Sequence, residues 1–214
     1  MMMKRKLFFG TALSVLLFAC TEANNEETKT EEQVDEVQIC TYNYQPETTV
    51  INWTAFKTTA KKGVSGKFDN FDVLVPNNGN EFMIQSLNSA TITIPVNSVN
   101  SDNPERDKKI DSLFFGAMEH TEIISVLIKS ITETNAVVEI TMNGKSVDYE
   151  GQITVENQTV IFNATINLDD FEAQPAVESL NTACKELHTG EDGVSKLWSE
   201  VDIKVETTLK QNCN

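Results

Sequence analysis

Hydrophobic and polar residues alternate with a period of two along most of the chain. The alternation is clearest in residues 90–96, 138–142, 160–168 and 197–209, where nearly every second residue is apolar. Successive side chains of a β-strand point to opposite faces, so this pattern predicts strands with one buried face and one solvated face. In the last stretch, Trp198 falls on the solvated face.

Further strands are expected between these stretches. They are predicted at about 48–57, 64–75, 81–88, 123–132 and 147–156. Glycine-containing breaks separate several of them, at Gly63, Gly79 and Asn143-Gly144. Eight or nine antiparallel strands in one domain are typical of an all-β barrel or sandwich.

Two segments interrupt the strand pattern with helical spacing. Residues 103–115 combine an Asn cap, a Pro at the first helical position, and apolar residues three and four apart. Residues 176–188 also place apolar side chains at helical spacing, and they end in His-Thr-Gly. We therefore expect one or two short helices, the second of them against one mouth of a barrel.

The first twenty residues differ from the rest of the chain. A basic start is followed by thirteen apolar or small residues, which is the length of a signal-peptide core and too short to cross a bilayer. The closing sequence Leu17-Phe18-Ala19-Cys20 resembles the bacterial lipobox, in which Cys20 is acylated and residues 1–19 are removed. The alternative is an ordinary secretory signal. Acylation at Cys20 would hold the protein to a membrane through two or more acyl chains.

Acidic residues dominate the mature chain. The net charge is −15, and it becomes −18 without residues 1–19, which carry three basic residues and no acidic one. Residues 20–38 contain seven acidic residues and one Lys, with almost nothing apolar, so they predict a disordered acidic tether before a domain at 39–214. The 214-residue length suits one such domain. Strong acidity disfavours nucleic acid as a partner.

Two motifs in the domain resemble a known family. The segment Val64-Ser65-Gly66-Lys67-Phe68 matches V-x-G-x-F, and the segment from Arg106-Asp107 to Phe114-Phe115 is similar to R-D-x-x-L-x-x-x-F-F. Both belong to the YceI-like family of secreted, lipocalin-like lipid-binding barrels, and the resemblance covers roughly residues 42–209. It implies an eight-stranded antiparallel barrel that holds a long polyisoprenoid or similar amphiphile in its interior.

The sequence departs from the family pattern at two places. The stretch 116–123 lacks the usual Pro before the next strand, and the end of the family domain is replaced by the helix around Cys184 and by Lys196-Leu197-Trp198. These changes are expected to reshape the mouth of the cavity. The resemblance therefore argues more strongly for the fold than for the ligand.

The candidate ligand-binding residues are those predicted to face the barrel interior. They are Ile92, Ile94, Val96, Phe114, Phe115, Val138, Ile140, Met142, Phe162, Ala164, Ile166, Val201, Ile203 and Val205. A barrel of about eight strands is wide enough for packed side chains or for one slender ligand. A filled barrel needs the same alternation, so each residue fits plain core as well as ligand wall.

Few other residues suggest a role in binding or catalysis. Arg106 and Asp107 are expected to hold the first helix to the barrel as an ion pair, with a ligand headgroup as the alternative partner. His120 and His188 lack partners at metal-ligand spacing and are expected to be surface or capping residues. No common catalytic or phosphate-binding motif appears. We therefore expect a non-catalytic protein with no metal and no cofactor other than a bound lipid.

Cysteine usage agrees with export. With Cys20 acylated, Cys40, Cys184 and Cys213 remain. In a closed antiparallel barrel the first strand lies beside the last, which predicts a disulfide between Cys40 and Cys213 and a buried thiol at Cys184. Cys40 with Cys184 is the rival pairing.

The sequence therefore predicts a lipoprotein of the cell envelope that carries, stores or senses an isoprenoid-like or fatty amphiphile. We expect it to be anchored to the outer membrane, facing the periplasm or the surface. The alternative is a filled barrel that acts in adhesion or envelope assembly through protein contacts.

Overall fold

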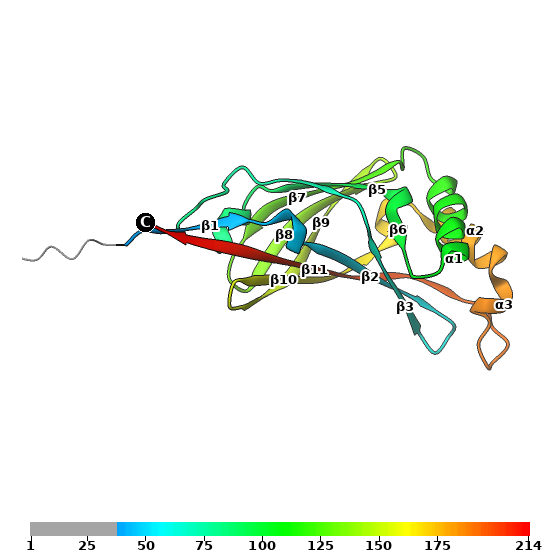
Figure 1. Cartoon of the computed structure of the whole chain (residues 1–214). Helices are drawn as coiled ribbons and strands as arrows, with labels where there is room; N and C mark the ends of the chain where they lie inside the picture. The colour runs from blue at the N-terminus through cyan, green and yellow to red at the C-terminus, as the bar shows by residue number, and fades with distance from the viewer. Residues whose placement is uncertain (1–37) are drawn as a thin grey trace, which may run out of the picture. The chain divides into compact units, whose positions relative to one another are not determined.

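The computed structural model describes residues 38–214 (Figure 1). The predicted signal peptide at 1–19, the acylation site Cys20 and all but the last residue of the predicted tether lie outside the described residues. Among the described helices, none is both long and apolar enough to cross a membrane.

β-Strands are the main secondary structure of the described domain. The strands are β1 (Cys40–Tyr44), β2 (Val50–Lys57), β3 (Lys62–Phe68), β4 (Asp72–Leu74), β5 (Thr91–Pro95), β6 (Val99–Asn100), β7 (Ile123–Ile131), β8 (Asn135–Met142), β9 (Lys145–Glu156), β10 (Thr159–Asn167) and β11 (Leu197–Cys213). The α-helices are α1 (Pro104–Lys109), α2 (Gln174–Ala183) and α3 (Lys185–His188). Short 3₁₀ or π turns occur at Pro46–Thr48, Ile84–Leu87, Val96–Ser98, Ile110–Phe114, Phe115–Ala117 and Leu168–Phe171.

All strands belong to one antiparallel sheet that curls around the core. Its order is β4-β5-β7-β8-β9-β10-β11-β2-β3-β6, and β1 pairs with the far half of β11. The expected class, an all-β antiparallel barrel of lipocalin-like form, is confirmed. Eleven strands replace the expected eight because β1 and β2 are one strand interrupted at Pro46 and because β4 and β6 are only three and two residues long.

The strand order has two ends, β4 and β6. Within residues 38–214, no ladder pairs β4 with β6. Instead, the backbone of Ser98 accepts from the Asp69 N–H at 2.9 Å, and the Ser98 hydroxyl donates to the Asn70 carbonyl at 3.0 Å. These bonds connect the turn after β5 to the turn after β3. The barrel is therefore closed between β4 and β6 by hydrogen bonds between loops.

Local sequence explains the tight turns. Asn143 and Gly144 form the two-residue loop between β8 and β9, and both have positive φ angles, 51° and 68°. Such loops favour Asn-Gly because both central residues must adopt the left-handed region. The predicted break at this position is therefore a hairpin turn.

One predicted strand is wrong and another is wrong in part. Residues 81–88 contain a 3₁₀ turn at Ile84–Leu87 in place of a strand, with Ile84 and Leu87 buried three residues apart and Phe82 exposed. The Ser86 hydroxyl donates to the Tyr42 carbonyl at 3.1 Å, which satisfies the buried polar group. Residues 64–75 divide into β3 and β4 because the chain turns at residues 69–71.

Both predicted helical segments are helical. In α1 the Asn103 side chain accepts from the Arg106 N–H at 3.0 Å, as expected for the cap, and Pro104 begins the helix. A π-helical turn continues it through Phe114, which buries Phe114 and Phe115 against each other with ring centroids 5.0 Å apart. The second segment forms α2 and α3, and all three α-helices gather at one end of the domain (Figure 1).

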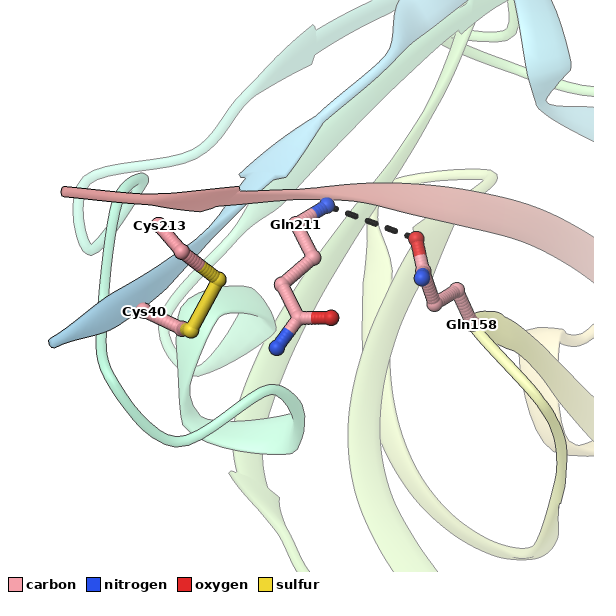
Figure 2. The surroundings of a disulfide bond; sticks show 4 residues. All are labelled: Cys40, Gln158, Gln211 and Cys213. Atoms are coloured by element: carbon pink, nitrogen blue, oxygen red, sulfur yellow. Dashed lines mark hydrogen bonds between the residues drawn. A yellow bond between two sulfur atoms is a disulfide. The ribbon is translucent and has the colours of Figure 1, made fainter. Parts of the chain in front are cut away.

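The opposite end carries a disulfide between the first and last strands. Cys40 and Cys213 are direct partners in the β1–β11 register, and the structure joins their sulfur atoms (Figure 2). Nearby, the Gln211 backbone N–H donates to the Gln158 side-chain oxygen at 3.3 Å. Cys184 is a buried free thiol. The pairing is the one expected from the neighbouring positions of the two strands.

Candidate functional site

An apolar cavity of about 140 Å³ lies inside the barrel, and we call it the inner cavity. It is lined by side chains from every described strand except β6. Its lining residues are Tyr44, Thr49, Ile51, Phe68, Val73, Leu87, Ala90, Ile92, Ile94, Ile124, Val126, Ile128, Ile131, Ala136, Val138, Ile140, Met142, Ile153, Val160, Phe162, Ile166, Ile203, Val205 and Thr207. None of them is charged.

Strand β8 shows how the sequence builds this wall. Its inward residues Ala136, Val138, Ile140 and Met142 are all buried, whereas the residues between them are exposed or half-buried. β-Branched side chains are stiff at χ1 and suit a pleated surface, so the wall stays in place beside unfilled space.

A second apolar cavity, also about 140 Å³, lies beneath the helices, and we call it the helix-side cavity. Phe114 and Leu180 cover it from the helical segments. Its lining residues are Trp53, Ala55, Phe68, Val99, Ile110, Phe114, Phe115, Ile124, Met142, Ile166, Leu168, Leu180, Leu197, Trp198, Val201 and Ile203. The two cavities adjoin, because Phe68, Ile124, Met142, Ile166 and Ile203 line both.

Three hydroxyl groups form the polar part of the inner cavity. The Thr49 hydroxyl lies 2.9 Å from the Tyr44 hydroxyl and 2.8 Å from the Thr207 hydroxyl. Burial raises the pKa of Tyr44, the hydrogen bond from Thr49 lowers it, and the charge of Glu47 raises it further. These groups satisfy one another, so the rest of the cavity surface offers only hydrocarbon contacts.

Twelve of the fourteen predicted lining residues border one cavity or the other. Val96 does not, because it begins the 3₁₀ turn after β5 and packs into the solid core. Ala164 is half-buried on β10 and borders neither, since its methyl group is shorter than the side chains of Phe162 and Ile166 on the same row. The other twelve lie together as predicted, and their contact with a ligand stays a prediction.

Sequence reasoning missed several wall residues on β2 and β7. Ile51, Trp53 and Ala55 alternate on β2, and Ile124 and Val126 alternate on β7. The period-two signal in the predicted strands at 48–57 and 123–132 could have found them.

Trp198 lies in the helix-side cavity wall, so its predicted place on the solvated face is wrong. The register between β11 and β2 shifts between Leu197 and Val201, which brings both Leu197 and Trp198 to the cavity. The Trp198 indole N–H donates to the Thr58 carbonyl at 2.7 Å. An irregularity of this kind breaks the alternation that the prediction relied on.

Arg106 and Asp107 both bind Ser101, which is buried where the chain enters α1. Arg106 donates from Nε to the Ser101 hydroxyl and from a terminal nitrogen to its carbonyl, each at 2.7 Å. Asp107 accepts from the Ser101 N–H at 2.9 Å and from its hydroxyl. The motif therefore fastens the helix through a shared partner rather than as an ion pair.

The two histidines differ. His120 is exposed, as expected, but His188 is only 8% exposed, so its predicted surface position is wrong. Its Nδ1 lies 3.0 Å from the Asn181 side-chain oxygen. Burial, followed by the charges of Lys57 and Lys109, lowers the pKa of His188. Within the described part of the chain, no cluster of three metal-ligating side chains occurs.

An antiparallel, lipocalin-like barrel that encloses apolar cavities defines the class of this protein. Residues 42–209 match the model of the YceI-like domain, and the chain belongs to the YceI-like family. Among curated proteins, UPF0312 proteins of Staphylococcus aureus are similar. That of strain MRSA252 is 38% identical over 81 residues, which are 38% of this chain and 46% of the relative. The chain thus matches less than half the length of these relatives.

Two solved structures share the fold. A polyisoprenoid binding domain from Saccharophagus degradans, implicated in plant cell wall breakdown, is 12% identical with a TM-score of 0.53, over 81% of this chain and 99% of that one. BcnA of Burkholderia cenocepacia is 17% identical with a TM-score of 0.51, over 78% of this chain and 99% of that one.

Proposed function

We propose that the barrel interior binds the hydrocarbon chain of an isoprenoid-like or fatty amphiphile. The observation that carries the proposal is the pair of adjoining, uncharged cavities, each about 140 Å³. Either cavity alone is smaller than the pockets that usually hold small molecules, which measure roughly 300–1,000 Å³. A slender chain that runs through both is the occupant that fits this arrangement.

The energetics favour such an occupant. Each CH₂ group removed from water contributes about 0.8 kcal/mol, so ten of them contribute about 8 kcal/mol before the cost of immobilising the chain. The cavity wall contacts a bound chain through apolar groups. A hydrocarbon therefore leaves no polar group of the wall without a hydrogen-bond partner. The similar fold of the Saccharophagus polyisoprenoid binding domain supports the same class of ligand.

The proposed role is carrier, store or sensor of the lipid and not catalyst. The lining of both cavities holds no carboxylate, histidine, lysine or arginine that could act on a bound molecule. The unfilled volume favours this role over that of a filled barrel in adhesion or envelope assembly, which would have no need of internal space.

We further propose that the protein works at the cell envelope, anchored to the outer membrane through acylated Cys20. The support is the basic start, the short apolar core and the Leu17-Phe18-Ala19-Cys20 sequence. An anchored carrier would receive its ligand from the membrane in which that ligand dissolves.

Native mass spectrometry of the full chain, purified in mild detergent, tests the ligand proposal. We expect a non-covalent adduct whose extracted lipid has an isoprenoid or fatty chain. A ligand-free protein that also takes up no prenyl alcohol or prenyl quinone would overturn the carrier role. Intact mass after cleavage tests the anchor: a diacylglyceryl adduct at Cys20 supports it, and an unmodified thiol contradicts it.

A further inference from the structure

A third pocket, of about 320 Å³, lies at the helical end of the domain and is rich in cations. Lys57 reaches it from the end of β2, Arg106 and Lys109 from α1, and His188 from α3. Glu105 is the carboxylate in its lining. We call this the cationic pocket.

The two lysines of the cationic pocket lack counter-charges. Among residues 38–214, neither Lys57 nor Lys109 has a carboxylate oxygen within 4.0 Å, whereas five of the twelve lysines do. Lys62 stands directly opposite Lys57 in the β2–β3 register and adds a further positive charge nearby. The domain as a whole is strongly acidic, so a pocket with three basic side chains and one carboxylate in its lining is a local excess of positive charge.

The pKa of the buried His188 imidazole also reflects the positive charge of the pocket. The charges of Lys57 and Lys109 both lower the pKa of His188, after the larger effect of burial. Both lysines line the same pocket as His188, Lys57 from β2 and Lys109 from α1. Arg106 has two nitrogens committed to Ser101, and its remaining N–H groups are not so committed.

The cationic pocket adjoins the helix-side cavity. Trp53, Ala55, Ile110, Leu180 and Leu197 line both. The helix-side cavity in turn adjoins the inner cavity. A molecule with a charged head in the cationic pocket could therefore place its tail in the apolar interior without crossing a further layer of the fold.

We infer that Lys57, Lys109 and Arg106 bind the anionic headgroup, a phosphate or a carboxylate, of the amphiphile whose chain occupies the barrel. The inference rests on the proposed function and narrows its ligand to anionic amphiphiles. Half-buried cations are poorly screened by salt, and Arg and Lys make charge-assisted hydrogen bonds to phosphate and carboxylate oxygens. An anion would relieve the mutual repulsion of the two lysines.

Matched ligands test the inference. Geranylgeranyl phosphate and geranylgeraniol have the same chain and differ in the charge of the head. For the unmodified protein we expect the phosphate to bind at least about tenfold more tightly at low salt, the gain from roughly one charge-assisted hydrogen bond. The double variant Lys57→Gln/Lys109→Gln should lose this preference and bind the alcohol as before. Equal affinities in the unmodified protein, or an unchanged preference in the variant, would overturn the inference.

Two control variants separate a specific effect of the pocket lysines from a general loss of charge and from misfolding. Lys204→Gln/Lys210→Gln removes the same charge from β11, outside the pocket lining, and should keep the preference. If the double variant does not fold, Lys109→Gln alone, on the helix α1, should still weaken phosphate binding and leave alcohol binding unchanged.

Inorganic pyrophosphate is the third probe. Competition by it against geranylgeranyl phosphate supports the same headgroup site. If neither prenyl compound binds, the proposed function fails. In that case, if the unmodified protein binds pyrophosphate and the double variant does not, the pocket is an anion site for free phosphates. If the unmodified protein does not bind pyrophosphate either, the anion site is overturned as well.

Discussion

The indole of Trp53 lies against Gly66, its direct partner on the neighbouring strand. A Cβ atom at Gly66 would stand 2.3 Å from the Trp53 ring and 2.6 Å from the Asn100 carbonyl oxygen. Only glycine leaves room for both. Gly66 is the central residue of the V-x-G-x-F motif, and this contact explains why the motif has glycine there. The glycine leaves space for the large Trp53 side chain in the wall of the helix-side cavity.

Gly66→Ala is therefore expected to destabilise the domain. Forcing a methyl group into this contact should lower the free energy of unfolding by about 1–3 kcal/mol, as overpacking does elsewhere. Urea unfolding measures the change. Gly116→Ala is the matched control, since a Cβ there would meet only a carbonyl oxygen at 3.5 Å. Equal stability of the two variants would contradict the account of the motif.

Gly151→Ala should affect the cavity directly. A Cβ at Gly151 would stand 2.2 Å from the Phe162 ring, which lines the inner cavity. The ring must move, so we expect reduced uptake of geranylgeraniol together with some loss of stability. Binding measured below the unfolding transition separates the two effects, and an unchanged affinity would show that Phe162 does not shape the ligand path.

Ile140→Trp should block the inner cavity. The indole would occupy unfilled space in the barrel, so we expect uptake of prenyl alcohol to fall at least about tenfold, which corresponds to about 1.4 kcal/mol, while the fold is retained. Circular dichroism checks the fold. Ile123→Trp, at the exposed start of β7, is the control and should bind normally. Full uptake by the Ile140 variant would place the ligand elsewhere.

The Cys40–Cys213 bond should stabilise the domain. It closes a loop with a sequence separation of 173 residues, and its removal in Cys40→Ser/Cys213→Ser should cost about 2–5 kcal/mol. Cys184→Ser leaves this bond in place and serves as the comparison. Peptide mapping without reduction should yield a crosslinked 40–213 peptide, whereas a 40–184 peptide would contradict the pairing.

Burial of His188 should make stability depend on pH. Its pKa is lower in the folded state than in the unfolded chain, so protonation favours unfolding. The stabilisation is complete above the unfolded pKa of about 6.5 and is lost as the pH falls from there through the lower folded value. Thermal melts at pH 7.5 and 5.5 should show a loss that His188→Gln reduces and that His120→Gln leaves intact. An unchanged pH dependence in His188→Gln would contradict this assignment.

Much of the fold could be predicted because a strand with one buried face has an apolar residue at every second position of the sequence. Strands β8, β10 and most of β11 show this clearly, and most of their inward residues line the cavities. The prediction failed where a register shift moved Trp198 and where Ile84 and Leu87 use a spacing of three. Periodicity cannot reveal such local irregularities.

The cationic pocket illustrates a different limit. Lys57, Lys109 and His188 come from three separate elements, and nothing in their local sequence relates them. Similarly, Ser101 gave no signal as the shared partner of Arg106 and Asp107. Contacts between distant segments depend on how the helices cover the end of the barrel, and that packing has no counterpart in the spacing of residues.

The two tryptophans report directly on lipid binding in the barrel interior, because Trp53 and Trp198 are the only ones in the chain and both line the helix-side cavity. Titration of the full protein with a brominated long-chain alcohol should quench their fluorescence. We expect saturable quenching at one ligand per protein, which geranylgeraniol reverses by competition. Quenching that stays linear and unsaturated, or that geranylgeraniol does not reverse, would contradict a lipid-binding interior.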